Sequence, residues 1–300
     1  MSASLTVRLA TRASPLARWQ AEATAAALTE SDGRIVAELV EVSTEGDRKA
    51  DVPLEVIGGK GVFVKEVQAA VLDGRADVAV HSAKDLPALG PEGLELAAFL
   101  PRADPRDALV GARLIDLPTG ARVGTGSARR RAQLLDLRPD LEVVGLRGNI
   151  ATRLGRVGEL DAIVVAAAAL DRLGLADRAN ELLAPSLFCP QVGQGAVAVE
   201  CRRDDAGVRA ALAAIDDEPT RWCVEAERSF LADLGGDCTI PAGAFARLDG
   251  ADPVGISMIG VLATGEGRPA RGTVRGGVGG DERVRLGASL ARRLRGTPGS

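Results

Sequence analysis

The feature that most constrains the fold is a repeated order of strand-like and helix-like segments in the first 200 residues. Short apolar runs such as ADVAV (76–80) and DAIVVA (161–166) are typical of strands buried inside parallel sheets. Stretches 15–28 and 128–137 lie between such runs and are predicted to be helices. Strands that alternate with helices over short connections predict α/β sheets that are mostly parallel.

The pattern occurs twice along the chain. With a shift of 84 residues, DVAVHSAKDL (77–86) lies over DAIVVAAAAL (161–170). Separately, LATRASP (9–15) resembles VGTGSAR (123–129), since each is a strand ending near Thr with a Ser before a helix. We therefore expect two α/β domains of related build that face each other across a cleft. The first copy ends in His-Ser-Ala-Lys-Asp and the second in alanines, so chemistry is expected in one copy only. Ligands of open α/β sheets bind beyond the carboxyl ends of strands, where this segment lies.

The sequence changes character after residue 217. TRWCVEAERSFLADL (220–234) has apolar residues near helical spacing, VGISMIGVLAT (254–264) is strand-like, and a last helix is predicted over 281–295. These segments indicate a further, smaller α+β domain. We predict three domains with these bounds: 1–101 together with 201–217, which return to it; 102–200; and 220–300.

Composition excludes several classes of function. The chain is 46% hydrophobic and 26% charged with a net charge of −4, which describes a soluble globular protein. Five Phe, two Trp and no Tyr argue against nucleic-acid binding by aromatic stacking. One histidine and four cysteines without a CxxC pair predict no metal site. Because we find neither an apolar signal-peptide core nor a run of 18 apolar residues, we expect a cytoplasmic protein with no membrane partner.

Basic residues are concentrated in one part of this acidic chain. Residues 122–156 hold eight arginines and three acids, an excess of five positive charges that suggests an anion site. GTGSARRR (124–131) places Ser127 as a helix cap and then three arginines in the first helical turn, where positive charge opposes the helix macrodipole. A bound polyanion would compensate for them. Arg147 and Arg153 extend the set, and a solvated basic face is the alternative.

Two further loops carry candidate ligand-binding residues. Arg12 and Ser14 lie between the first strand and its helix, and Ser14-Pro15 suits an N-cap followed by the first helical position. The free amides of such a helix start could hold an anion, or Ser14 could be a plain cap and Arg12 a solvated side chain. GGKGVF (58–63) carries Lys60 and Phe63 on a Gly-rich loop that is either a mobile lid or an ordinary turn.

The segment HSAKDLP (81–87) contains three candidates for chemistry. His81 directly follows buried strand residues, so we expect a satisfied core group that shapes the turn. Lys84 could form a Schiff base, although nothing nearby resembles a phosphate cup for pyridoxal phosphate. Asp85 could act as a general acid–base or as a counter-ion for a cationic intermediate, or could simply cap the next turn.

The cysteines divide into two kinds. Cys201 and Cys223 fall inside predicted elements and are expected to be inert core residues. Cys238 lies in GGDCTIPAG (235–243), a loop of Gly, Asp and Pro, where a thiol is more exposed and reactive. With no histidine near it, a covalent anchor is a better hypothesis than a protease-like dyad.

Together these stretches resemble the porphobilinogen deaminase (hydroxymethylbilane synthase) family. The segments that carry the resemblance run in the family's order from about residue 7 to 245: ATRASPLA, GGKGVFVKE, RADVAVHSAKDLP, DPRDALV, VGTGSARRRAQL, LRGNIATRL, DAIVVA, VGQGAVAVE and ERSFLADLGGDCTIPAG. The resemblance implies two related periplasmic-binding-protein-like α/β domains around a cleft and a smaller C-terminal α+β domain. It also implies a transferase that joins four porphobilinogen molecules head to tail into hydroxymethylbilane, with release of ammonia.

The resemblance assigns roles to individual residues. A dipyrromethane cofactor would be attached through a thioether to Cys238, and Asp85 matches the catalytic carboxylate. Lys60 and Phe63 would belong to a lid loop. The family's positions that bind the carboxylates of cofactor and substrate correspond here to Arg12, Ser14, Lys84, Ser127, Arg129, Arg130, Arg147 and Arg153. The chain departs from the family at Gly126, where Ser is frequent, at Asp237, where Gly is common, and at Ala242, where a bulkier aliphatic is usual.

The residue-level reasoning accords with this chemistry. Each pyrrole unit brings two carboxylates, so a growing chain is a polyanion that needs many guanidinium groups. Loss of ammonia from porphobilinogen leaves an azafulvene cation, which the Asp85 carboxylate would stabilise. We expect a monomer that binds this small molecule and no nucleic acid. The main alternative is a non-catalytic two-domain protein that binds an anion or polycarboxylate, which would need neither Asp85 nor Cys238.

Overall fold

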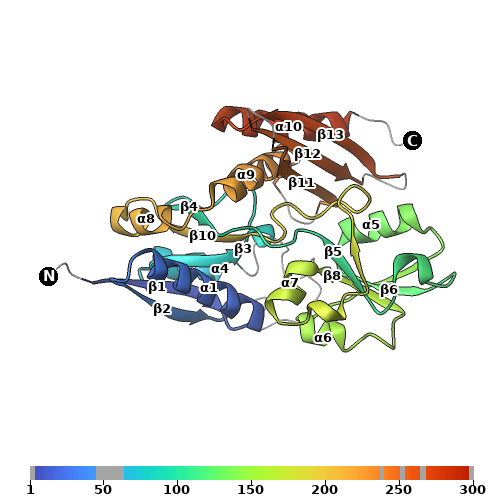
Figure 1. Cartoon of the computed structure of the whole chain (residues 1–300), viewed down its shortest axis with the longest axis horizontal. Helices are drawn as coiled ribbons and strands as arrows, with labels where there is room; N and C mark the ends of the chain where they lie inside the picture. The colour runs from blue at the N-terminus through green and yellow to red at the C-terminus, as the bar shows by residue number, and fades with distance from the viewer. Residues whose placement is uncertain (1–3, 45–63, 237–239, 251–253, 264–267, 297–300) are drawn as a thin grey trace. The chain divides into compact units, whose positions relative to one another are not determined.

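The computed structural model of the chain describes residues 4–44, 64–236, 240–250, 254–263 and 268–296 (Figure 1). Two compact units divide the chain. Unit 1 consists of Met1–Arg102 and Ala196–Arg221, and unit 2 consists of Ala103–Gly195 and Trp222–Ser300. The segment that returns to unit 1 thus starts at Ala196, before residue 201.

Unit 1 is built on one five-stranded sheet with the strand order β2-β1-β3-β10-β4. Strand β1 is parallel to β2 and β3, whereas β10 is antiparallel to β3 and β4. The sheet is therefore mixed and not mostly parallel, because its fourth strand comes from a distant part of the chain. The strands are β1 (Leu5–Arg12), β2 (Ile35–Val42), β3 (Val78–Ser82), β4 (Leu94–Phe99) and β10 (Val197–Arg202).

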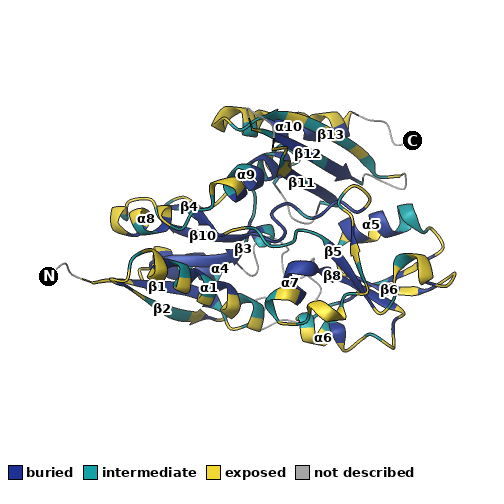
Figure 2. Cartoon of the chain, in the orientation of Figure 1, coloured by how far each residue is buried: buried dark blue, intermediate teal, exposed yellow. Residues whose placement is uncertain are grey.

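Helices cover both faces of this sheet. Successive strand residues point to opposite faces, so Val78 and Val80 pack in a core cluster with α1 residues while Ala79 packs with residues of α4. Burial on both faces explains why β3 is a continuous apolar run, and Figure 2 shows it buried along most of its length. The helices are α1 (Pro15–Ser31), α4 (Lys65–Leu72) and α8 (Ala206–Ala213), with a short 3₁₀ turn η1 (Ala83–Asp85) after β3.

Unit 2 begins with a second five-stranded sheet, with the strand order β7-β6-β8-β5-β9. Its strands are β5 (Asp107–Val110), β6 (Arg122–Gly124), β7 (Glu142–Val144), β8 (Ala162–Ala166) and β9 (Glu181–Leu183). Its helical segments are α5 (Ala128–Leu137), α6 (Ile150–Leu154), α7 (Ala167–Arg172), η2 (Leu114–Asp116) and η3 (Ala176–Arg178).

The two sheets share one topology. In unit 2, β6 is parallel to β7 and β8, and β5 is antiparallel to β8 and β9, as β1 and β10 are to their neighbours in unit 1. The registers also agree, because Leu9 lies opposite Val78 in the first sheet and Val123 lies opposite Ala162 in the second. These are the residues that the two sequence alignments match. The prediction of two related α/β domains is confirmed.

The correspondence extends to a side-chain hydrogen bond. Asp77 precedes β3 and its carboxylate accepts a hydrogen bond from the Arg8 backbone N–H at 2.9 Å. Asp161 precedes β8 and accepts one from the Arg122 backbone N–H at 2.7 Å. In each sheet this bond joins the start of the central strand to its parallel neighbour.

The C-terminal part is a three-stranded antiparallel sheet with two helices, which confirms the predicted smaller α+β part. The elements are β11 (Ala242–Leu248), β12 (Gly255–Leu262), β13 (Ala270–Gly277), α9 (Glu218–Asp233) and α10 (Gly280–Arg295). Glycines on the sheet let α10 approach closely, since a Cβ on Gly260 would come within 2.8 Å of the Leu290 side chain. Among the residues that the structure describes, no helix combines the length and apolarity needed to cross a membrane.

Candidate functional site

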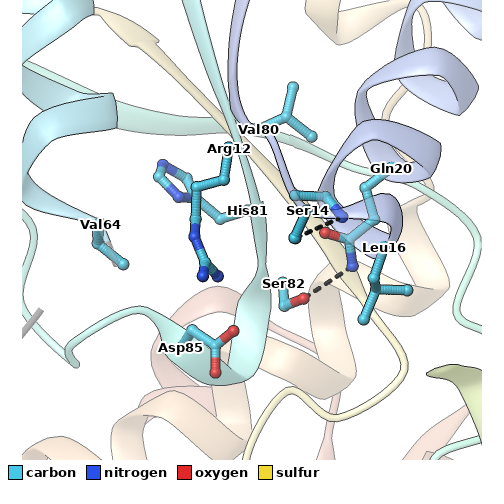
Figure 3. Close-up of a pocket in the computed structure, with 10 residues that line it drawn as sticks. Arg12, Ser14, Leu16, Gln20, Val64, Val80, His81, Ser82 and Asp85 are labelled. Atoms are coloured by element: carbon cyan, nitrogen blue, oxygen red, sulfur yellow. Dashed lines mark hydrogen bonds between the residues drawn. The ribbon is translucent and has the colours of Figure 1, made fainter. Parts of the chain in front are cut away.

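A pocket lies at the carboxyl end of β3 in unit 1 (Figure 3). Its empty volume is about 410 Å³, which includes space open to solvent. The sequence-predicted residues Arg12, Ser14 and Asp85 all line it. The full lining is Arg12, Ser14, Leu16, Ala17, Gln20, Val64, Val80, His81, Ser82 and Asp85.

The segment from the end of β1 through α1 carries three of the polar side chains that line the pocket. Arg12 is the last residue of β1, and Ser14 is the N-cap of α1, with its hydroxyl accepting a hydrogen bond from the Ala17 N–H at 3.3 Å. Pro15 begins the helix, as the sequence predicts for a residue that lacks an N–H. Further along α1, the buried Gln20 amide donates to the Ser82 hydroxyl at 2.8 Å. This bond ties α1 to the end of β3.

The carboxylate of the pocket is carried by a short turn. After β3 ends at Ser82, the η1 turn places Asp85 at its last position, with the Leu86 N–H bonded to the Ala83 carbonyl at 3.3 Å. In Figure 3 the Asp85 carboxylate and the Arg12 guanidinium point toward one another. Lys84 is half-buried in the same turn and is not one of the described residues that line the pocket.

His81 belongs to a buried polar group behind the pocket. Its Nε2 lies 3.1 Å from Glu200 Oε2, and both side chains are 3% exposed. The Gln68 amide donates to the same Glu200 oxygen at 2.8 Å. The predicted burial of His81 is confirmed, but its description as a satisfied core group is not. Among the described residues, its Nε2 has a charged neighbour but no aligned hydrogen bond.

In unit 2, the arginines at the start of α5 surround a single buried carboxylate. Arg129 donates to one oxygen of Asp107 at 2.8 Å, and Arg130 donates to the other at 2.6 and 3.0 Å. Gln194 adds a bond of 2.9 Å to the second oxygen. Ser127 caps the helix, as predicted, by accepting from the Arg130 N–H at 3.4 Å.

The Asp107 carboxylate supplies negative charge next to the arginines at the start of α5. Burial alone would raise the pKa of Asp107, but the charges of Arg129 and Arg130 and the hydrogen bonds from Gln194 and Arg130 together hold it well below its usual value. Asp107 therefore neutralises part of the positive charge at the start of α5 that a bound polyanion was expected to neutralise. Sequence reasoning missed Asp107, although the residue stands in the quoted segment DPRDALV at the start of an apolar strand.

The other predicted anion-binding residues of unit 2 follow β7. Arg147 and Arg153 are both half-buried, and Arg153 donates to the Gly148 carbonyl at 2.8 Å. The departure at Gly126 has a physical reason, because a Cβ there would lie 2.7 Å from the Leu146 carbonyl oxygen. A serine would force this turn to move.

Several predicted residues lie outside the described part of the chain. They are the proposed lid residues Lys60 and Phe63, the anchor Cys238, and Asp237 beside it. The other three cysteines are buried, as predicted for Cys201 and Cys223. Burial raises the pKa of the Cys189 thiol to about 12 and that of Cys201 to about 11. Within the described ranges no three potential metal ligands cluster.

The donor set of the pocket suits an anionic ligand that also passes through a cationic state. A guanidinium and a helix start with a capping hydroxyl can bind carboxylates, and a half-buried carboxylate beside them can stabilise a positive charge. These donors fit a pyrrole that carries acidic side chains, such as dipyrromethane.

Comparison with known proteins identifies the group to which these features belong. Residues 7–210 match the family model described as porphobilinogen deaminase, dipyromethane cofactor binding domain, and residues 222–296 match that of the porphobilinogen deaminase C-terminal domain. The chain belongs to the porphobilinogen deaminase family. The family predicted from the sequence is thus confirmed, and with it a transferase of tetrapyrrole biosynthesis in preference to a non-catalytic binding protein.

Curated relatives cover nearly the whole of this deaminase. The porphobilinogen deaminase of Acidithiobacillus ferrooxidans is 50% identical over 267 residues, 87% of this chain and 86% of that protein. That of Roseiflexus sp. is 47% identical over 294 residues, 96% and 95% of the two chains. A looser structural likeness links the deaminase to a TRAP periplasmic solute binding protein from Desulfovibrio salexigens, with 12% identity, a TM-score of 0.45, and coverage of 73% and 75%.

Proposed function

We propose that the pocket at the end of β3 is where this deaminase condenses porphobilinogen, with Asp85 as its catalytic residue. Four porphobilinogen molecules are joined head to tail, and each addition releases one ammonia. One water molecule then cleaves the bond between the four-unit product and the dipyrromethane primer and supplies the hydroxyl group of hydroxymethylbilane. The observation that carries this proposal is the position of Asp85. It lies in a pocket with Arg12 and Ser14, at the carboxyl end of a buried central strand.

Asp85 can serve both halves of each addition. When the aminomethyl C–N bond breaks and ammonia leaves, the substrate becomes a cation, which the fixed carboxylate stabilises. A new C–C bond then forms to the terminal pyrrole carbon of the growing chain. That carbon loses its proton, which Asp85 accepts before passing it on to solvent or to the departing ammonia. Atoms and charge balance without any oxidant or reductant.

The basic residues bind the acidic side chains of the pyrrole units. Each acetate or propionate held by an arginine gains a charge-assisted hydrogen bond that contributes about 1.5–3 kcal/mol. In unit 1 this role falls to Arg12, Ser14 and Lys84. In unit 2 it falls to Ser127, Arg129, Arg130, Arg147 and Arg153.

Cys238 would hold the dipyrromethane, which when bound would supply the pyrrole carbon that receives the first substrate unit. Covalent attachment holds the chain in the site between additions and so keeps successive reactions intramolecular. For Lys60 and Phe63 the resemblance to the family implies a lid loop. We propose a three-domain division, with the segment that returns to the first domain starting at Ala196, for a monomeric, cytoplasmic enzyme that binds neither nucleic acid nor membrane.

The intact mass of the purified protein tests this function. Protein from a haem-producing host should carry an added mass equal to two linked pyrroles and should release ammonia from porphobilinogen. Cys238→Ser should lose the added mass, while Cys223→Ala, at a buried thiol, should keep it. An unmodified wild-type protein that releases no ammonia would contradict the proposal.

Replacement of the carboxylate separates binding from catalysis. Asp85→Asn keeps the size of the side chain but removes its charge and its capacity to take a proton, so kcat should fall by about 10²–10⁴-fold while the pyrrole adduct is retained. Glu92→Gln, at an exposed carboxylate on the same unit, should leave kcat unchanged. A kcat for Asp85→Asn close to that of the wild type would refute the assigned role.

A further inference from the structure

We propose that Glu200 is a positioning residue that acts through His81 to hold the strand end that carries Asp85. This inference rests on the proposed role of Asp85 and adds a residue that the reaction itself does not use. Glu200 lies on β10, His81 on β3 and Gln68 on α4, so one buried group joins three elements behind the pocket.

A carboxyl group buried in the middle of a sheet is energetically unfavourable unless other groups replace its contacts with water. The Glu200 side chain is 3% exposed, so its carboxyl group needs such partners. The Gln68 amide donates a hydrogen bond to Glu200 Oε2 at 2.8 Å, and His81 Nε2 lies 3.1 Å from the same oxygen. His81 is at the same time part of the pocket wall, so the group extends to the site.

The second sheet shows that the fold does not require this polar group. Glu200 lies opposite Ala79 in the first sheet, and Val110 lies opposite Ile163 in the second, where Ala79 and Ile163 are matched by the shift of 84 residues. By the same shift, His81 corresponds to Val165. Both valines are buried in one apolar core cluster of unit 2. The same topology is thus built with two valines where unit 1 has glutamate and histidine.

Unit 1 contains both the polar pair, His81 and Glu200, and the η1 turn that carries Asp85, whereas unit 2 lacks both. The residues that correspond to Lys84 and Asp85 are Ala168 and Ala169, both buried in α7. Because unit 2 keeps the sheet and lacks both the turn and the polar pair, the pair is tied to the chemistry of unit 1.

The geometry explains how the pair acts on Asp85. In Figure 3 the His81 ring and the Ser82 side chain leave β3 in opposite directions. His81 is held from the face that α4 covers, and the Ser82 hydroxyl is held by Gln20 of α1 at 2.8 Å. Asp85 follows three residues later in a single 3₁₀ turn. A shift of the strand end is therefore passed to its carboxylate, and a misplacement of about 1 Å can cost roughly 10²-fold in rate.

The decisive experiment replaces His81 and Glu200 of unit 1 with valine, the residue found at both corresponding positions of unit 2. The variant His81→Val/Glu200→Val replaces the pair with two valines, and Gln68→Leu is added so that its amide is not left without Glu200. Glu200→Gln replaces the carboxyl group by an amide of the same size. We expect both proteins to fold and to carry the pyrrole adduct, with kcat at least tenfold lower per adduct-bearing molecule and KM for porphobilinogen within twofold of wild type. The matched control is Glu95→Gln, on the neighbouring strand β4, whose carboxylate pairs with Arg209.

Hydrogen exchange gives a second readout that does not depend on turnover. Amides of residues 82–86 should exchange faster in Glu200→Gln than in Glu95→Gln. A wild-type protein without turnover would contradict the proposed function, whereas the exchange comparison would still test the positioning. If the triple variant fails to fold, Glu200→Gln decides by the same criteria. A kcat within twofold of wild type, or exchange equal to that of the control, would overturn the proposal, because a purely structural pair would change only stability.

Discussion

At the scale of single residues, the Asp107 carboxylate between Arg129 and Arg130 makes unit 2 sensitive to a change of one atom. Asp107→Asn leaves two buried guanidinium groups without their counter-charge, which should lower the free energy of unfolding by about 3–5 kcal/mol. Asp140→Asn, at a partly exposed carboxylate beside Arg138, should have a much smaller effect. Urea denaturation at pH 7 measures both, and equal losses in the two variants would contradict the prediction.

The pKa of Asp107 sets the sign of the pH dependence. Because its pKa in the folded protein is below the value of about 4 expected in the unfolded chain, the unfolded state binds more protons as the pH falls. The stabilisation by Asp107 is then present above about pH 4 and is lost as the pH falls through the folded-state pKa. The asparagine variant should accordingly lose less stability than the wild type between about pH 4 and pH 2.

Some of the residues of the site could be predicted from the sequence and others could not, and the difference has a physical reason. Ser14 and Ser127 were predictable as caps because a cap bonds to an amide three residues away. Asp107 and Glu200 were not, since their partners lie 22 and more residues away and become neighbours only when the sheets form. The role of Asp85 came from the resemblance to the family and stays a prediction.

At the scale of elements, the packing of α10 against α9 depends on one glycine. A Cβ on Gly287 would lie 2.1 Å from the Ala226 carbonyl oxygen and 2.7 Å from the Phe230 nitrogen, both backbone atoms that cannot move alone. Gly287→Ala should therefore destabilise the protein by about 1–3 kcal/mol, although alanine is the better helix former. Gly280→Ala, at an uncrowded position of the same helix, should be neutral or stabilising. Thermal unfolding compares the two, and a stabilising Gly287→Ala would refute the close approach.

Elements whose sequence pattern is local were predicted with nearly the right bounds. The helix expected over 128–137 is α5, and the strand expected over 161–166 is β8. The last helix, expected over 281–295, runs from Gly280 to Arg295. Strands β5 and β9 were not predicted, because they have four and three residues and are defined by pairing with distant strands.

At the scale of the whole molecule, the internal repeat was visible in the sequence but the strand directions were not. A shift of 84 residues matches β3 with β8 and correctly indicated two related sheets. The expectation of mostly parallel strands was wrong because β10 and β5 run antiparallel to their neighbours. The pairing of β10 with β3 joins segments more than a hundred residues apart, and no local periodicity can report such a contact.

The position of β10 also fixes the order in which the two sheets can form during synthesis. Strand β4 pairs only with β10 in the first sheet, and about a hundred residues separate the end of β4 at Phe99 from the end of β10 at Arg202. At roughly 5–20 residues per second the ribosome needs about 5–20 seconds to make that stretch. All five strands of the second sheet emerge in this interval. The five strands of the later half of the repeat are therefore available first, while β3 and β4 of the earlier half still have unpaired edges to which another chain could bind.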